Sequence, residues 1–447
     1  MSSLLREFVS LDAPPMLAGT LAALCCGLLG NFLVLRRLSL MGDAIAHSVL
    51  PGIVVAFLIA GTRASLPMFI GAAASGLVAA ALIEVVRRYG RVETGAAMGV
   101  VFTVLFALGV LLIERAAARH VDLDADCVLH GQLETLFWFP PEDPSEFWTM
   151  RTLAAVPRQV WTLALVTLIT VAFISAFFKE LRLAAFDPAL ATSLGFNAGM
   201  MHFALMTMVA AAAVASFEAV GSILVIAMFV CPAATARLLT DRLLPQIVVS
   251  AGVAVAAGVG GYLLAAFGPA TVGLPNAVNA AGMMTVVSGA FLAAAAVVGP
   301  RHGVLACLRR QSRLAVSIAR EDVLGLLYRA EELRGRGAAV GTADIRRAID
   351  AGAATRRALR AARRAGEVVP AGAGVALTDA GRARARSLVR SHRLWETYLV
   401  NIMGLRPDHV HATAMDLEHV TDAEMARRLA GRGGDRVDPH DRPIPPA

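Results

Sequence analysis

Two ionisable side chains, Asp43 and His47, stand four residues apart at the head of an apolar run. On a helix this spacing places both on one face, with their Cβ atoms about 6 Å apart. A carboxylate and an imidazole so arranged can bind a divalent metal at about 2.0–2.2 Å from each ligand atom. Ionisable groups are costly in a hydrocarbon layer, where they mark an ion pathway or a paired site. The alternative is a helix-capping Asp43 beside a hydrogen-bonded core His47, and the spacing alone leaves both open.

A second group of metal-binding side chains lies near the C-terminus, on two predicted helices. His392 and Glu396 are four residues apart on the first helix. His411, Met415 and His419 follow one another at intervals of four on the second. Imidazole, carboxylate and thioether groups on facing helices are typical of a transition-metal site. The members of this group are His392, Glu396, His411, Met415, Glu418 and His419.

The first 300 residues contain a succession of apolar runs, each close to the roughly 20 residues that span a bilayer. A composition of 57% hydrophobic residues agrees with a polytopic membrane protein. The runs lie near 16–35, 43–60, 66–86, 95–114, 160–179, 199–216, 220–239, 246–267 and 276–298. The sixth and seventh almost touch at Glu218, so both eight and nine spans are open. The predicted fold is an all-α membrane bundle.

The spans must position Asp43 and His47, and the basic residues predict their orientation. Arginines follow alternate spans, as at Arg36-Arg37, Arg87-Arg88 and Arg301, and such residues favour the cytoplasmic side. With nine spans, this rule places the N-terminus outside and everything after residue 300 in the cytoplasm.

Two further features lie late in the membrane part. Glu218 interrupts an apolar stretch, so it is either buried and paired or at a membrane boundary. Pro232 is expected to break the next span, since proline cannot donate a backbone hydrogen bond. The run after it ends in Arg237, Asp241 and Arg242, which predicts a short helix along the cytoplasmic surface. Such a helix could receive force from a motor subunit, although a simple interfacial turn would look the same.

The chain beyond Arg301 is rich in arginine, with 26 Arg against 17 Asp plus Glu. Residues 342–348 and 353–365 read as a helix–turn–helix, followed by a hairpin wing at 368–377. The second helix carries Arg356, Arg357, Arg360, Arg363 and Arg364. A winged helix with a basic second helix indicates nucleic-acid binding, and the alternative is a solvated arginine face.

Lys179 is the only lysine, and Glu180 follows it. A P-loop requires Lys followed by Ser or Thr to hold nucleotide phosphates, so we expect no Walker-type ATPase site and no bound nucleotide. The chain is therefore predicted not to be an enzyme, and ATP hydrolysis would need a separate subunit.

Residues from about 16 to 300 resemble the permease subunits of manganese, zinc and iron ABC importers, the ABC-3 family. The resemblance rests on FLVLRRLSLMGDAIAHSVLPGI, LRLAAFDPALATSLGF and SFEAVGSILVIAMFVCPAATARLLTD. It implies a multi-pass permease in a prokaryotic inner membrane, paired with a second permease, cytoplasmic ATPases and an external metal-binding protein. It also implies that Asp43 and His47 form the transport site, and that the segment from Pro232 to Arg242 couples to the ATPase.

Residues from about 320 to 446 resemble metal-dependent regulators of the diphtheria-toxin-repressor and manganese-regulator family. The resemblance rests on EDVLGLLYRAEEL, GVALTDAGRARA, SHRLWETYL, VHATAMDLEHV and VDPHDRPIP. One implied metal site uses His392, Glu396 and His411. The other uses Asp322, Met415, Glu418 and His419. Met415 and Gly325 depart from the ligands that family members carry, which predicts a weaker second site or one tuned to softer ions.

These observations predict a permease for divalent manganese, zinc or iron with a fused cytoplasmic metal sensor. The alternative is a membrane-tethered, metal-responsive DNA-binding regulator combined with the permease. The expected domains are a permease at 1–300, a linker at 301–319, a winged helix at 320–390 and a metal-binding and dimerisation region at 391–447. Because His47 must be neutral to bind metal, uptake should weaken as the pH falls through the histidine range. An Asp–His pair suits all three metals, and the sequence leaves open which is carried and whether the permease pair is homo- or heterodimeric.

Overall fold

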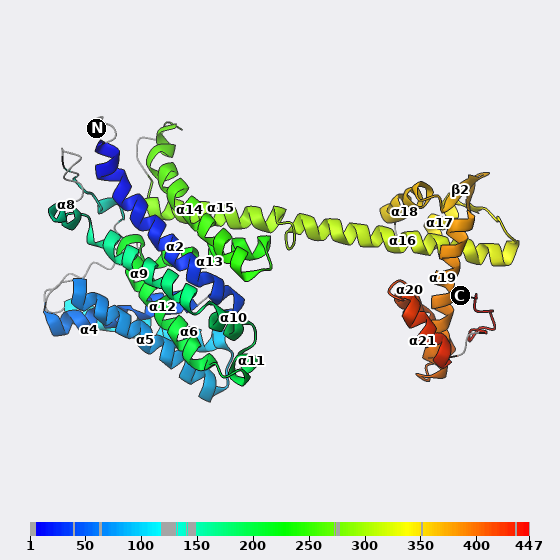
Figure 1. Cartoon of the computed structure of the whole chain (residues 1–447), viewed down its shortest axis with the longest axis horizontal. Coiled ribbons are helices and arrows are strands. Elements are labelled where there is room, and N and C mark those ends of the chain that lie inside the picture. Colours follow the sequence, from blue (N-terminus) through cyan, green and yellow to red (C-terminus); the bar gives the residue numbers. More distant parts are fainter. Residues whose placement is uncertain are drawn as a thin grey trace. The chain divides into compact units, whose positions relative to one another are not determined.

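The computed structural model describes residues 6–38, 41–61, 65–117, 131, 133–139, 141, 149–271, 273, 278–349, 352–433 and 436–446. Contacts divide the chain into two compact units, Met1–Ala306 and Cys307–Ala447 (Figure 1). We refer to them as the membrane unit and the C-terminal unit.

The membrane unit is helical throughout its described residues, and its central helix is α2 (Ala13–Leu35). Most of α2 is buried, because helices α9, α12, α13 and α14 pack around it. The helices of the unit are η1 (Phe8–Asp12), α2, α3 (Met41–Ser48), α4 (Leu50–Ala60), α5 (Ser65–Gly90), α6 (Thr94–Ala117), η2 (Leu133–Thr135), α8 (Met150–Ala154), α9 (Arg158–Ala176), α10 (Phe178–Phe186), α11 (Pro188–Ser193), α12 (Ala198–Val220), α13 (Ser222–Leu239), α14 (Leu243–Thr271) and α15 (Ala280–Val298).

Every predicted span corresponds to a helix, but the number long enough to cross a membrane is smaller than predicted. Among the described residues, seven helices are long and apolar enough, and the apolar stretches Leu50–Ala60 and Leu224–Leu239 are shorter. The predicted span at 43–60 is divided into α3 and α4 just before Pro51, which lacks a backbone donor. The sixth and seventh runs are separate helices, because Gly221 adopts a positive φ of 88° between α12 and α13.

The predicted break at Pro232 is wrong. Helix α13 continues through Pro232 to Leu239, and α14 begins at Leu243 after a short turn. A proline within an apolar helix is tolerated in a membrane bundle when neighbouring groups compensate for the lost hydrogen bond. The chain therefore has no separate surface helix between Pro232 and Arg242.

Glycines permit two close helix crossings near the Asp43–His47 segment. A Cβ atom added at Gly30 would lie 1.9 Å from the carbonyl oxygen of Phe229, so α2 and α13 touch through their backbones. Added Cβ atoms at Gly52 and Gly71 would lie 2.1 and 2.4 Å from each other's carbonyl oxygens. Small residues allow transmembrane helices to approach closely, and these glycines fix α4 against α5.

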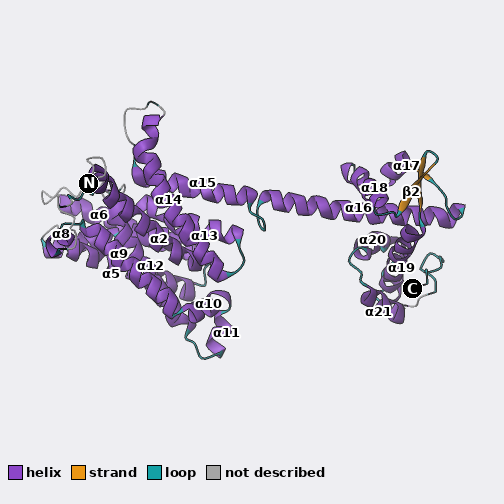
Figure 2. Ribbon diagram, turned by 45° about the horizontal axis from the view of Figure 1, so that its top comes forward, coloured by secondary structure: helices purple, strands orange, loops and turns teal. Residues whose placement is uncertain are grey.

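The C-terminal unit begins within a long helix, α16 (Val304–Arg334), whose first half covers most of the predicted linker. The remaining elements are β1 (Val340–Gly341), α17 (Thr342–Ile349), α18 (Ala353–Arg364), β2 (Val368–Ala371), β3 (Gly374–Leu377), α19 (Asp379–Asn401), η4 (Pro407–His409), α20 (His411–Glu418) and α21 (Ala423–Gly433). The strands form one antiparallel sheet in the order β1-β3-β2 (Figure 2).

This arrangement confirms the predicted winged helix. Its core contains Leu324 and Leu327 of α16, Ile345 of α17, Leu359 of α18 and Val375 of β3. A second, smaller core joins α19, α21 and the C-terminal segment through Leu394, Leu429 and Ile444. The two cores share α19, which runs from the wing to the C-terminal helices.

Candidate metal centres

Helix α3 carries both Asp43 and His47, so the predicted i, i+4 register is present in the backbone. Asp43 lies inside the helix rather than before its first residue, and its side chain falls outside the described part of the structure. The half-buried imidazole of His47 lies between two rings of α6, with centroids 5.8 Å from Phe102 and 5.6 Å from Phe106. Aromatic packing on this side fixes the plane of the imidazole.

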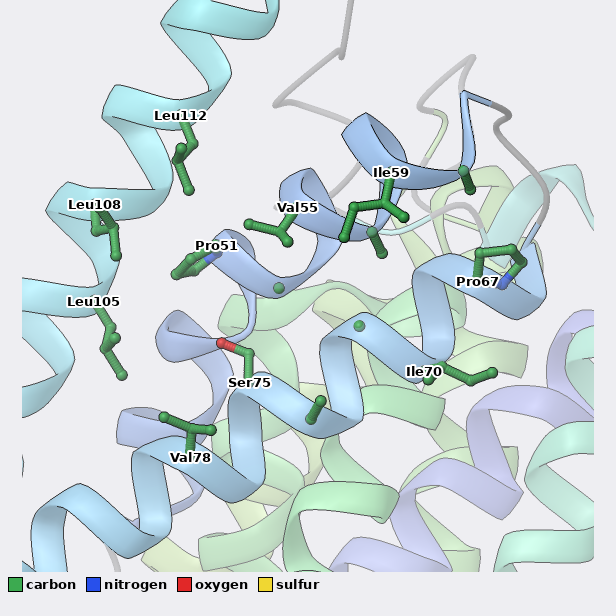
Figure 3. A pocket seen from close by; sticks show the side chains of 15 residues that line it. Pro51, Val55, Ile59, Pro67, Ile70, Ser75, Val78, Leu105, Leu108 and Leu112 are labelled. Atoms are coloured by element: carbon green, nitrogen blue, oxygen red, sulfur yellow. The ribbon is translucent and has the colours of Figure 1, made fainter.

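An apolar pocket of about 640 Å³ follows directly along the chain, between α4, α5 and α6 (Figure 3). Side chains such as Val55, Ile70 and Leu108 line it, and Ser75 is its one polar side chain. The Ser75 hydroxyl donates to the carbonyl oxygen of Ser48 at 2.6 Å. The residues that line this pocket include no imidazole or carboxylate.

Glu218 lies near the end of α12, half-buried, three residues before Gly221. Its carboxylate accepts a hydrogen bond of 3.2 Å from the side-chain amide of Gln159, in the first turn of α9. Glu218 is therefore hydrogen-bonded near the end of α12, and its position relative to a membrane boundary stays a prediction.

The predicted coupling residues lie around the turn between α13 and α14. Asp241 pairs with Arg301 at 2.5 Å, with His302 at 2.8 Å and with Arg237 at 3.6 Å. Hydrogen bonds from His302 and Arg301 lower the pKa of Asp241 to about 2. This exposed cluster ties the α13–α14 turn to the turn that precedes α16, while Arg242 is exposed beside it.

Another surface turn, which no site prediction included, exposes apolar side chains. Asp187 caps α11 by accepting hydrogen bonds from the amides of Ala189 and Leu190. Around this cap, Phe186 is 60% exposed and Leu194 is 57% exposed. Short exposed apolar helices between two spans have the character of a docking surface.

The C-terminal unit brings His392, Glu396 and His411 together, and we call this group the His411 site. The Nδ1 atom of His411 lies 2.8 Å from Oε1 of Glu396, and Nε2 of His392 lies 3.1 Å from Nδ1 of His411. His392 and Glu396 are buried on α19, whereas His411 is exposed at the first turn of α20. Donor atoms this close can share one cation at the usual distance of about 2.1 Å.

The residues of the His411 site shift one another's pKa values. Burial alone would raise the pKa of Glu396, but hydrogen bonds from His392 and His411 outweigh it and lower the pKa to about 2. Burial opposes protonation of His392, yet Glu396 and Glu418 together raise its pKa. The carboxylate is therefore ionised and ready to act as a ligand.

A second group, which we call the His419 site, contains Asp322, Glu418 and His419. Nε2 of His419 lies 3.2 Å from Oδ1 of Asp322 and 3.9 Å from Oε1 of Glu418. Hydrogen bonds to Asp322 and Glu321 raise the pKa of His419 to about 10. Met415, the remaining predicted ligand, lies one turn earlier on α20 and is 39% exposed.

The two sites meet at one buried contact. Nδ1 of His392 and Oε2 of Glu418 lie 2.6 Å apart, but their alignment is not that of a hydrogen bond. Both atoms are therefore buried without a hydrogen-bond partner among the described residues. Buried polar atoms left unpartnered are costly, and a bound cation would satisfy them, so this donor set fits a divalent metal.

Two residues with a place at these sites were missing from the sequence prediction. Glu321 accepts a hydrogen bond from Nδ1 of His419 at 2.8 Å, which orients the other nitrogen toward Asp322. Nε2 of His440 lies 4.0 Å from Oε1 of Glu396. Glu321 adjoins Asp322 in sequence, which was a usable signal, whereas His440 reaches Glu396 only because the C-terminal segment folds back over α19.

The predicted nucleic-acid-contacting arginines all lie on α18 and are exposed. Arg357, Arg360 and Arg364 line an open recess of about 380 Å³, and Arg357 donates to the hydroxyl of Ser312 at 3.1 Å. The structure thus gathers them on one face of α18.

Comparisons with known proteins identify the membrane unit. Residues 11–137 and 150–298 match the sequence profile of the ABC 3 transport family. The chain belongs to the ABC 3 transport family. It is 39% identical over 300 residues to the manganese transport system membrane protein MntD of Bacillus subtilis, covering 66% of this chain and 95% of that protein. It is 34% identical to the zinc transport system membrane protein TroD of Treponema pallidum, covering 65% and 74%.

A solved structure supports the fold of this family member. The structure of PsaBC from Streptococcus pneumoniae in complex with Fab is 26% identical, with a TM-score of 0.51, over 65% of this chain and 92% of that chain. The relatives are membrane proteins of transport systems, so the prediction of a permease subunit rather than an enzyme is confirmed.

The C-terminal unit matches a different profile. Residues 378–446 match the metal binding and dimerisation domain of iron-dependent repressors. This range contains every residue of the His411 site and two of the three in the His419 site. The predicted fusion of a permease with a metal-regulator domain is confirmed.

Proposed function

We propose that this protein is the membrane-spanning permease of an ATP-driven importer for a divalent transition metal, with a fused domain that senses the same class of metal. The observation that carries the proposal is the presence, in one chain, of an ABC 3 permease and two convergent imidazole–carboxylate sites. Relatives named for manganese and zinc transport support manganese or zinc as the cargo.

In the membrane unit, Asp43 and His47 are the proposed ligands of the transported ion. Their register on α3 lets both reach one cation, and Phe102 and Phe106 hold the plane of the imidazole. His47 must be neutral to bind the ion, so uptake falls as the pH is lowered.

The proposed partners follow from membership of the ABC 3 transport family. A cytoplasmic ATPase supplies energy, an external binding protein delivers the metal, and a second permease completes the pathway. Two surfaces are proposed to receive the ATPase: the turn with Arg237, Asp241 and Arg242, and the exposed apolar residues around Asp187.

In the C-terminal unit, the proposed role is feedback from cytoplasmic metal. A divalent cation would be bound by His392, Glu396 and His411, with Asp322, Glu418 and His419 forming the neighbouring site. A bound cation would supply positive charge to offset the carboxylates; the first set of residues comes from α19 and α20, and the second from α16 and α20. Because the sites meet at His392 and Glu418, their occupancies are coupled.

A second candidate role is a membrane-tethered DNA-binding regulator, which the exposed arginines of α18 favour. DNA retention by the full chain, and the dependence of that retention on salt, would test this role.

The test of the main proposal is uptake of Mn²⁺ and Zn²⁺ into proteoliposomes that contain the cognate ATPase. We expect uptake that requires ATP and that is lost in Asp43→Ala. Uptake without ATP would instead indicate a secondary transporter and overturn the proposal.

A further inference from the structure

Two sets of arginines in the C-terminal unit differ in their partners. Four arginines of α19 and the second half of α16 are paired with carboxylates: Arg320 with Glu367, Arg382 with Glu331, Arg384 with Glu321 and Arg393 with Glu332. Those of α18 and the first half of α16 make no ion pair within the described ranges. This second group contains Arg309, Arg310, Arg313, Arg356, Arg357, Arg360, Arg363 and Arg364.

The unpaired arginines define one basic surface. Residues 301–320 and 352–366 contain no Asp or Glu, so nothing acidic on these stretches offsets their charge. The hydrogen bond from Arg357 to Ser312 joins α18 to the first half of α16. The recess lined by Arg357, Arg360 and Arg364 is open to an anionic group. This surface therefore fits a partner with many negative charges.

Apolar side chains accompany these charges on α16. Leu305 is 41% exposed, Leu308 is 55% exposed and Leu314 is 60% exposed. Along the helix Leu308 projects from the side opposite Arg309, Arg310 and Arg313, whereas Leu305 and Leu314 flank the arginines on either side. A helix that carries both kinds of side chain suits the interface of a membrane, where leucines enter the lipid and arginines remain at the headgroups.

The length of the chain limits how far this surface can lie from the end of α15. Arg309 follows Val298, the end of α15, by only eleven residues. Even a fully extended segment of that length spans less than about 40 Å, and residues 304–309 are helical and therefore shorter. An anionic leaflet attracts basic residues within about 10 Å of its surface.

We propose that the basic surface formed by α18 and the first half of α16 docks on the anionic phospholipid headgroups of the leaflet at which residues 299–303 emerge. The inference rests on the membrane location of the proposed permease. The winged helix is thereby used as a membrane-docking face rather than as a reader of DNA. A DNA duplex carries one negative charge per about 1.7 Å of its axis, so the same leaflet repels it.

The experiment uses the full chain in nanodiscs of phosphatidylcholine alone or mixed with phosphatidylglycerol. A fluorophore is attached to Ala365→Cys in a background with Cys127→Ser and Cys307→Ser, and headgroup-labelled lipid acts as the quencher. We expect quenching only with phosphatidylglycerol, and we expect added salt to remove it.

The variant Arg357→Gln/Arg360→Gln/Arg364→Gln removes the three positive charges that line the recess. Because each basic residue near an anionic surface contributes a factor of about five to binding, the docked-to-undocked ratio should fall about 100-fold. The matched control Arg427→Gln/Arg432→Gln/Arg436→Gln removes three exposed arginines elsewhere in the unit and should leave docking unchanged. Unchanged Mn²⁺ binding by both variants verifies that the unit is folded.

Equal quenching in both lipids would show that these arginines are only a solvated face, and it would overturn the inference. Retention of labelled duplex DNA in the presence of phosphatidylglycerol, lost in the triple variant, would also overturn it in favour of nucleic acid. Neither outcome bears on the proposed transport function, which is measured separately by ATP-dependent uptake.

Discussion

The two proposed kinds of metal site in this chain differ in how their ligands are supplied. In the membrane unit, Asp43 and His47 lie on one short helix, four residues apart. In the C-terminal unit, ligands come from α16, α19 and α20, which are separated by up to about one hundred residues in sequence. A transport site must release its ion, so a site with few protein ligands suits transport. A sensor must change its structure when metal binds, so ligands from several helices suit sensing.

The comparison is tested most directly by removing one of the two proposed ligands in the membrane unit. Asp43→Ala or His47→Ala leaves a single ligand, and even outer-shell changes at metal sites cost roughly 10–100-fold. We therefore expect ATP-dependent uptake to fall by more than about 100-fold. Tyr89→Phe, a change at an exposed aromatic residue near the end of α5, serves as the control and should retain most uptake. Preserved uptake in Asp43→Ala would remove this residue from the transport site.

The multi-helix site should tolerate the loss of one ligand better. His411→Ala removes an exposed ligand at the start of α20 and should lower metal affinity of the His411 site by roughly 10–100-fold. Calorimetric titration of the full chain with Mn²⁺ measures this change. His409→Ala, which removes an exposed histidine two residues away, is the control. Equal affinities of His411→Ala and the unaltered chain would rule out this ligand.

The His419 site should depend steeply on pH. Because Asp322 and Glu321 raise the pKa of His419 to about 10, the imidazole is protonated at neutral pH and must lose its proton to bind metal. Apparent affinity should therefore rise about tenfold per pH unit below 10, with one proton released per ion. Titrations in buffers of different ionisation enthalpy report that proton. In Glu321→Gln the dependence should be weaker, and a flat profile in the unaltered chain would contradict the assigned ligand.

The smallest predicted effect concerns His440, a further contributor to the multi-helix His411 site. Its Nε2 atom, 4.0 Å from Glu396, is placed to complete the His411 site without belonging to α19 or α20. His440→Ala should weaken metal binding by up to about tenfold, less than His411→Ala. An effect equal to that of His411→Ala would show that His440 is a full ligand.

The sequence predicted which segments are helical better than it predicted where those helices are interrupted. Long apolar runs and the helix–turn–helix pattern are local signals, so the apolar helices and the winged helix were predicted, although only seven of the described helices are long enough to cross a membrane. The break before Pro51 and the continuity through Pro232 depend on neighbouring helices, which local propensity does not contain.

The sites show the same limit. Residues on one helix, such as His392 and Glu396, were predictable from spacing alone. The contact between His392 and Glu418, the role of Glu321 and the approach of His440 depend on how α16, α19 and the C-terminal segment pack. Asp322 entered the prediction only through the family resemblance, because nothing nearby in sequence marks it as a ligand.

The proposed feedback requires communication from the metal-binding C-terminal unit to the permease. The direct test is ATP-dependent Mn²⁺ uptake into proteoliposomes with the cognate ATPase, at low and high internal Mn²⁺. Full-length protein is compared with a chain truncated at Arg310 and with full-length Glu396→Gln/His411→Ala. We predict that high internal Mn²⁺ slows uptake by full-length protein and that both altered chains escape this inhibition. Uptake by full-length protein that is the same at every internal Mn²⁺ concentration would contradict the feedback role.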